Sequence, residues 1–285
     1  MDKDTNNLAL LHTRSTAAVI RDGYKLYIAN FRNIFKSSWT AAAFYALVIG
    51  ALQTLADHLT AAIAVAVILI ALIPLYASGS TTLSRHQQTG VVSGPKHWWG
   101  SLSNVMLRRS CITAVIIVAA FTLFACGYYC VGYIGTKYLS RIAFLALVYA
   151  ITLVFSILLA PIFVGTTKYT MHLYTGKKTN FFLPFRYWGS AIIILFVVCI
   201  ITMVLIAITE LPAVILLLAN LKSQAGALQG DPTGMPEHML WLNLIVFSLA
   251  AFVQAFVLLT AIFPFYYLNG SLAMQEQERK NINRQ

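Results

Sequence analysis

Six long apolar stretches without Asp, Glu, Lys or Arg run through the chain, separated by polar connectors. They are Trp39–Ala56, Leu59–Ser84, Cys111–Thr136, Ile142–Thr167, Tyr187–Thr209 and Met239–Gln275. A helix needs roughly 20 apolar residues to cross a bilayer, and strands of a membrane barrel would show shorter alternating segments instead. The pattern predicts an all-α, polytopic membrane protein with six transmembrane helices, forming a single membrane domain over residues 1–285.

The second, fourth and sixth stretches share a Pro and Gly pattern near their ends. Each Pro is followed within a few residues by a Gly, and a second Gly or an Asn lies 11 positions further on. These triplets are Pro74, Gly79, Gly90; Pro161, Gly165, Gly176; and Pro264, Gly270, Asn281. Gly and Asn tolerate the left-handed conformation that ends many helices. We therefore expect each of these helices to stop at the last residue of its triplet.

A second similarity lies before the third and fifth stretches. The segment His97-Trp98-Trp99-Gly100-Ser101 resembles Arg186-Tyr187-Trp188-Gly189-Ser190, and a Trp suits the membrane interface. We predict three pseudo-repeated hairpins, each preceded by an amphipathic interfacial segment, with approximate limits 15–90, 91–176 and 177–281. Residues 1–14 are expected to form a disordered tail.

The segment before the first stretch is the clearest amphipathic one. Apolar residues follow the 3, 4, 7 spacing of one helix face, at Ile20, Tyr24, Tyr27, Ile28, Phe31, Ile34 and Phe35. Basic residues line another face, at Arg21, Lys25, Arg32 and Lys36. A helix lying in the membrane interface has this arrangement, with its basic face toward the headgroups. The segment is interpreted as a membrane anchor or as a docking surface for a partner.

The distribution of charge predicts the orientation in the membrane. Of the 20 Lys and Arg residues, 17 lie in the N-terminal segment, the second and fourth connectors and the C-terminal tail. Cytoplasmic loops carry the excess of Lys and Arg. We expect a multi-pass protein of the cytoplasmic (inner) membrane, with both termini in the cytoplasm.

The net charge of +11 does not indicate a nucleic-acid partner, because the basic residues lie beside lipid-spanning stretches. Anionic headgroups are the nearer partner, and each basic residue near the surface gains about 1 kcal/mol from them. A protein partner on the cytoplasmic face is a second possibility. The candidate lipid- or partner-contacting residues are Arg21, Lys25, Arg32, Lys36, Arg108, Arg109, Lys177 and Lys178.

The basic aromatic segment Gly23–Phe31, the hairpin after it and the Pro and Gly pattern resemble a family of membrane proteins. This is the broad group of six-helix bacterial membrane proteins that includes the membrane domain of some glycerophosphodiester phosphodiesterases. The resemblance covers roughly residues 15–275. It implies a six-helix membrane fold but no catalytic residue, because the phosphodiesterase chemistry of that family belongs to a separate soluble domain.

Few residues in the apolar stretches could carry chemistry. Glu210, followed by Pro212, is interpreted either as an interfacial residue where the helix leaves the membrane or as a functional intramembrane carboxylate. Gln53 and Gln254 are expected to make interhelical hydrogen bonds, as is Asn243. The cysteines and histidines form no metal-ligand pattern, and no hydrolase or phosphate-loop motif is found. We therefore expect no catalytic residue, no cofactor and no metal.

Together these features predict a non-enzymatic membrane scaffold or accessory protein whose basic cytoplasmic face docks on lipid or on a partner. The alternative is a transporter or permease component that moves a small solute or a lipid through the helix bundle. That alternative requires a polar interior that reaches into the membrane.

Overall fold

The computed structural model describes residues 12–54, 61–92, 108–120, 122, 141–171, 183–228 and 239–283, and the regular structure in these ranges is entirely helical. The helices are α2 (Thr16–Ala29), α3 (Phe31–Thr54), α4 (Ala61–Thr89), α7 (Arg141–Met171), α8 (Leu183–Arg186), α9 (Trp188–Thr209), α10 (Leu211–Leu228), α11 (Met239–Thr260) and α12 (Ile262–Ile282). The stretch 108–120 is also helical.

Four helical stretches of the described chain are long and apolar enough to cross a membrane. They are Phe31–Thr54, Ala66–Gln87, Trp188–Thr209 and Trp241–Ile282. They overlap the first, second, fifth and sixth predicted stretches, which supports a multi-pass membrane protein. The fourth predicted stretch is helical as α7. Most of the third, Cys111–Thr136, lies outside the described residues.

The most extensive helix pair is formed by α3 and α11, with α4 packed beside α3. Small residues recur at every fourth position of α3, at Ala42, Ala46 and Gly50, and all three are buried. A Cβ at position 50 would lie 2.0 Å from Oγ of Ser248 and 3.1 Å from the Leu244 carbonyl oxygen on α11. Small residues at this spacing let two helix backbones approach closely, and such packing holds helices together in lipid, where no hydrophobic force does so.

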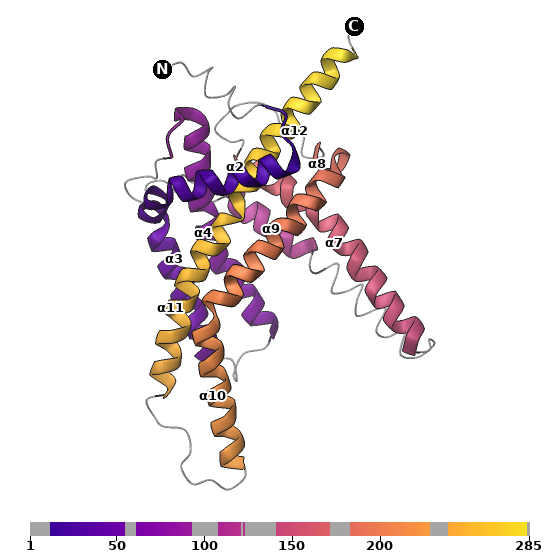
Figure 1. Ribbon diagram of the computed structural model, residues 1–285. Helices are drawn as coiled ribbons and strands as arrows, with labels where there is room; N and C mark the ends of the chain where they lie inside the picture. The colour runs from indigo at the N-terminus through magenta and orange to yellow at the C-terminus, as the bar shows by residue number, and fades with distance from the viewer. Residues whose placement is uncertain are drawn as a thin grey trace.

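The sixth predicted stretch forms two helices, with Ala261 between α11 and α12. Pro264 lies in the first turn of α12, where no intrahelical donor is lost. Helix α2 lies across α12 at this point (Figure 1), with Val19, Gly23 and Tyr27 on its buried face. A Cβ at position 23 would lie 2.6 Å from the backbone nitrogen of Pro264. The crossing therefore brings backbone against backbone.

Helices α4, α7 and α12, which carry the recurring prolines Pro74, Pro161 and Pro264, contact one another pairwise, and a side-chain hydrogen bond joins each pair. The hydroxyls of Tyr76 and Thr170 join α4 to α7 at 2.9 Å. Nδ2 of Asn269 on α12 donates to Oγ1 of Thr167 on α7 at 3.2 Å. Nδ1 of His86 and the Tyr266 hydroxyl join α4 to α12 at 3.1 Å. We call these three bonds the interhelical triangle.

Helices α9 and α10 continue into one another at Glu210, with a change of direction (Figure 1). The Glu210 N–H donates to the Ile206 carbonyl and the Val214 N–H donates to the Glu210 carbonyl, both at 2.9 Å. The helical hydrogen bonds therefore run through this position in spite of Pro212. Helix α10 then packs beside α11, and Nδ2 of Asn220 donates to Oδ1 of Asn243 at 2.9 Å.

The predicted helix ends have different outcomes. Gly90 has φ 70° and its N–H donates to the His86 carbonyl at 2.8 Å, which confirms a left-handed stop after α4. Gly176 lies outside the described residues. The prediction for Asn281 was wrong, because α12 runs on to Ile282 and its C-cap, Asn283, is right-handed. The polar end of α12 needs no special cap, since water can satisfy its last carbonyls.

The amphipathic segment also differs from the prediction. It is divided at Asn30 into α2 and the first turns of α3. Ile28, Phe31 and Phe35 of the predicted apolar face are exposed, as a side turned toward the membrane would be, whereas Gly23, which the apolar pattern leaves out, is buried. The spacing of apolar residues predicts the buried face from hydropathy alone. Here the close approach of α2 to Pro264 requires the smallest residue, Gly23, to face α12.

Replacing Gly23 with Ala should push α2 away from α12, because the new methyl group would collide with the Pro264 backbone. A backbone cannot rotate out of the way as a side chain can. We expect a loss of about 1–3 kcal/mol in unfolding free energy, measured by thermal or denaturant unfolding in mild detergent. Gly189→Ala is the matched control, since a Cβ there meets nothing within 4 Å. Equal stability of the two variants would contradict a backbone contact at position 23.

Candidate functional site

The candidate site is the corner where α2 turns into α3. We define the α2–α3 corner by its exposed basic and apolar residues, which are Arg21, Lys25, Ile28, Phe31, Arg32, Phe35 and Lys36. All four basic residues that the sequence placed on one face of this segment are exposed, and Arg21 is 75% exposed. The side chain of Ile28 is 73% exposed beside them. The corner therefore combines positive charge with apolar groups, a combination suited to the membrane interface.

Packing beneath the corner fixes its shape. Phe35 stacks on Phe256 of α11 with ring centroids 5.1 Å apart, and Phe31 meets the same ring edge to face at 6.0 Å. On α2, the Tyr27 ring contacts Phe263 at 5.0 Å, and its hydroxyl donates to the Phe256 carbonyl at 3.0 Å. Aromatic pairs of this geometry add about 0.5–1.5 kcal/mol each to the burial of their area. The corner is thus held on α11 and α12 from below.

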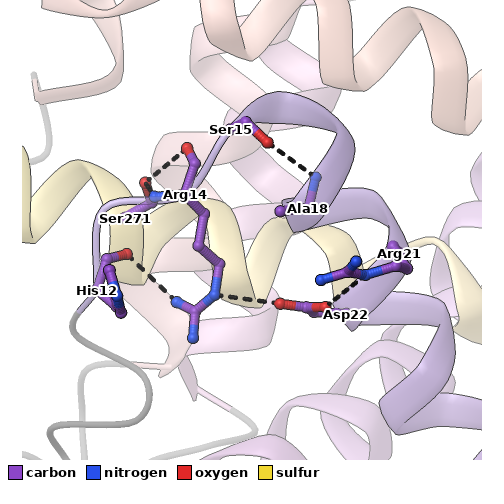
Figure 2. A network of polar contacts seen from close by, with 7 residues as sticks. All are labelled: His12, Arg14, Ser15, Ala18, Arg21, Asp22 and Ser271. Atoms are coloured by element: carbon purple, nitrogen blue, oxygen red, sulfur yellow. Dashed lines mark hydrogen bonds and ion pairs between the residues drawn. The ribbon is translucent and has the colours of Figure 1, made fainter.

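Arg14 holds the other end of α2 on α12 (Figure 2). Its side chain is only 13% exposed, its Nε lies 3.3 Å from Oδ2 of Asp22, and its guanidinium lies 4.9 Å from the centre of the Tyr267 ring. The Arg14 N–H donates to Oγ of Ser271 on α12 at 3.0 Å. The ion pair and the cation–π contact are both strengthened by this partial burial.

The same network begins the helix (Figure 2). Ser15 is the N-cap of α2, and its hydroxyl accepts from the Ala18 N–H at 3.3 Å. Asp22 is shared, because Nε of Arg21 donates to its Oδ1 at 3.1 Å while Arg14 lies at its Oδ2. These contacts fix Arg14, the last residue of the tail that was expected to be disordered. Residues 1–11 lie outside the described residues.

The remaining predicted basic residues are not equivalent. Arg108 is exposed, as expected for a lipid-contacting residue. Arg109 instead donates from its NH1 to the Tyr169 carbonyl on α7 at 3.3 Å and lies 4.9 Å from the Tyr169 ring centre. Lys177 and Lys178 lie outside the described residues. Arg109 therefore holds the helical stretch 108–120 against α7, and its guanidinium is occupied by Tyr169.

The predicted intramembrane polar residues lie in different environments. The Tyr45 hydroxyl of α3 donates to Oε1 of Gln254 on α11 at 3.0 Å, which confirms the interhelical hydrogen bond expected of Gln254. Asn243 makes the expected bond as well, with Asn220. Gln53 is exposed. Glu210 is half-buried at the junction of α9 and α10.

Sequence reasoning missed Arg14 and Asp22. The partial signal was local: Ser15 is an ordinary N-cap residue, so a helix beginning at Thr16 could have been found, with Asp22 among basic neighbours. The partners of Arg14, however, are Tyr267 and Ser271, more than 250 positions away. Among the described residues, no three His, Cys, Asp or Glu side chains are placed to hold a metal ion.

The chain matches no protein-family model, no curated protein and no solved structure. The resemblance to the membrane domain of glycerophosphodiester phosphodiesterases therefore stays a prediction.

Replacing Arg14 with Leu should loosen α2, since it removes the ion pair with Asp22 and the contact with Tyr267. A hydrogen bond to a charged group is worth about 1.5–3 kcal/mol, so the α2 amides should exchange with solvent at least about tenfold faster. Hydrogen exchange read by mass spectrometry measures this. Arg21→Leu is the control, because native Arg21 contacts the same carboxylate from an exposed position, and its loss should change the exchange rate little. An equal effect of both variants would argue against a special role of Arg14.

Proposed function

We propose that this protein is a non-enzymatic membrane scaffold or accessory protein whose α2–α3 corner docks on anionic lipid headgroups. The observation that carries the proposal is the division of charge on α2. Arg14 is bound between α2 and α12, whereas Lys25, Arg32 and Lys36 are exposed on the outward side. Because contacts with α12 already hold α2 in place, its exposed basic side chains can bind headgroups without a large loss of backbone entropy. This favours a docking role.

The positions of α2 and of the C-terminal end of α12 suggest that the α2–α3 corner and both termini lie on one side of the membrane. Helix α2 and the C-terminal end of α12 lie at the same end of the molecule (Figure 1), and that end of α12 carries Arg279 and Lys280. Lys and Arg concentrate on the cytoplasmic side of membrane proteins. We therefore assign the α2–α3 corner to the cytoplasmic face of the inner membrane, with both termini on that side.

The interhelical triangle supports the threefold pseudo-repeat. Each of its helices belongs to the second arm of one proposed hairpin, with α12 following α11 in the third, and each contains one of the recurring prolines. Two of the three bonds use an aromatic residue two positions after the Pro, Tyr76 and Tyr266. The equivalent residue of α7, Phe163, contacts the Phe265 ring of α12 at 5.1 Å. This arrangement is what three related hairpins around a common centre would produce.

The hydroxyl groups of the interior favour packing over a transport pathway. Oγ1 of Thr82 donates to the Ser78 carbonyl, that of Thr166 to the Phe163 carbonyl and that of Thr167 to the Val164 carbonyl, each at 2.8 Å. Side chains bonded back to their own helix offer few free donors to a solute. The polar interior that transport requires is therefore occupied with intrahelical bonds at these positions, and we prefer the scaffold to the transporter.

The test is replacement of Lys25, Arg32 and Lys36 by Gln in the full chain, reconstituted in nanodiscs of phosphatidylcholine with phosphatidylglycerol. Each basic residue near an anionic surface contributes about 1 kcal/mol, so enrichment of phosphatidylglycerol around the protein should fall at least about tenfold. The retained lipid is quantified by mass spectrometry at low and high salt.

Replacement of Lys222 by Gln, on α10 at the opposite end of the molecule, is the control and should leave the enrichment unchanged. If the triple variant keeps its phosphatidylglycerol but loses a protein that co-purifies with the wild type, the corner serves a protein partner and the lipid proposal is wrong. Retention of both would refute a docking role altogether.

A further inference from the structure

A second charged cluster lies where α8 and the start of α9 meet α12. Its centre is the carboxylate of Glu276, whose side chain is 16% exposed. NH1 of Arg186 donates to Oε2 at 3.3 Å and to Oε1 at 3.4 Å, and the Tyr187 hydroxyl donates to Oε2 at 3.4 Å. Nζ of Lys280 lies 3.8 Å from Oε1. Residues from three helical segments thus converge on one carboxylate.

A third cation belongs to the cluster from α7. Helix α7 contacts both α8 and α12, and Lys168, which follows the last residue of the apolar stretch Ile142–Thr167, feels the charges of Glu276 and Lys280. Burial lowers the pKa of Lys168 to about 8, Glu276 opposes this, and the like charge of Lys280 adds to it. At neutral pH the ammonium group is therefore still charged, but less favourably than in water.

We propose that Lys168, Arg186 and Lys280 form a binding site for the phosphate monoester headgroup of a membrane lipid. Arg186 and Lys280 share the carboxylate of Glu276, and Lys168 adds a third positive charge, so positive charge exceeds negative charge in this cluster. A phosphate monoester carries between one and two negative charges at neutral pH and accepts charge-assisted hydrogen bonds from Lys and Arg. This site is separate from the α2–α3 corner and binds one headgroup, whereas the corner attracts a charged surface.

The surroundings of the cluster favour a lipid over free phosphate. Arg186 stands two residues before the apolar helix α9, and Trp188 is exposed beside it, as expected at a membrane interface. A Cβ at Gly189, three residues after Arg186, meets nothing within 4 Å, so this side of the first turn of α9 is open. No side chain caps α9 at Tyr187, and the positive end of its dipole adds to the field of the cations.

The experiment uses the full chain in mild detergent and native mass spectrometry with phosphatidic acid, phosphatidylglycerol and inorganic phosphate as probes. The variant Lys168→Gln/Arg186→Gln should lose affinity for phosphatidic acid by at least about tenfold, because each cation makes a charge-assisted contact. The control Lys222→Gln removes a positive charge on α10, outside this cluster and outside the α2–α3 corner, and should keep wild-type affinity. Lys280→Gln, at an exposed position, should weaken binding by about two- to fivefold with no risk to folding.

The outcomes separate this site from the proposed function. Wild-type affinity in both Lys168→Gln/Arg186→Gln and Lys280→Gln would overturn the site, even if the corner variants lose phosphatidylglycerol as proposed above. Equal affinity for phosphatidylglycerol and phosphatidic acid would overturn the preference for a monoester. Displacement of phosphatidic acid by an equal concentration of inorganic phosphate would show a site for the free ion and overturn the lipid assignment. Loss of phosphatidic acid binding in Lys25→Gln/Lys36→Gln, with wild-type binding in Lys168→Gln/Arg186→Gln, would place the lipid at the α2–α3 corner and overturn the site.

Discussion

The contact between the backbones of α2 and α12 at Gly23 and Pro264 determines how the first part of the chain is placed. With no side chain at position 23, α2 reaches the Pro264 backbone directly. That approach buries Val19 and Tyr27 on the same face and turns Lys25 and the start of α3 outward. Arg14 then holds the beginning of α2 on the far side of α12. The exposed basic corner is therefore a consequence of which face of α2 can come closest to α12.

The remaining helices obey the same constraint that a bilayer imposes on every helix pair. Lipid chains are as apolar as leucine, so helices associate through close packing and hydrogen bonds. Gly50 and the small residues before it allow the close packing of α3 against α11. The interhelical triangle and the Tyr45–Gln254 bond are the hydrogen bonds between helices. Most interior hydroxyls bond to their own helix, which leaves packing as their main contribution.

The arginines show how one residue type serves different purposes in this protein. Arg14 and Arg109 lie over aromatic rings and hold helices together. Arg186 meets a carboxylate at the start of α9, where excess positive charge gathers. Arg32 is exposed at the corner. In the sequence all four are basic residues of the polar segments that precede an apolar stretch, and only their partners distinguish a structural cation from one that is free to meet a headgroup.

The sequence by itself determined the class of the protein, because the length and polarity of a stretch decide whether it can cross lipid, whatever its neighbours are. It also determined local features that depend on a few adjacent residues, such as the left-handed stop at Gly90 and, from lone polar groups in apolar helices, the bonds of Gln254 and Asn243. Only the tertiary structure decided which face of α2 is buried, that Arg14 is fixed, that the helix continues through Glu210 and that Arg186 and Glu276 meet. These depend on contacts between residues far apart in the chain, and periodicity carries no information about such contacts.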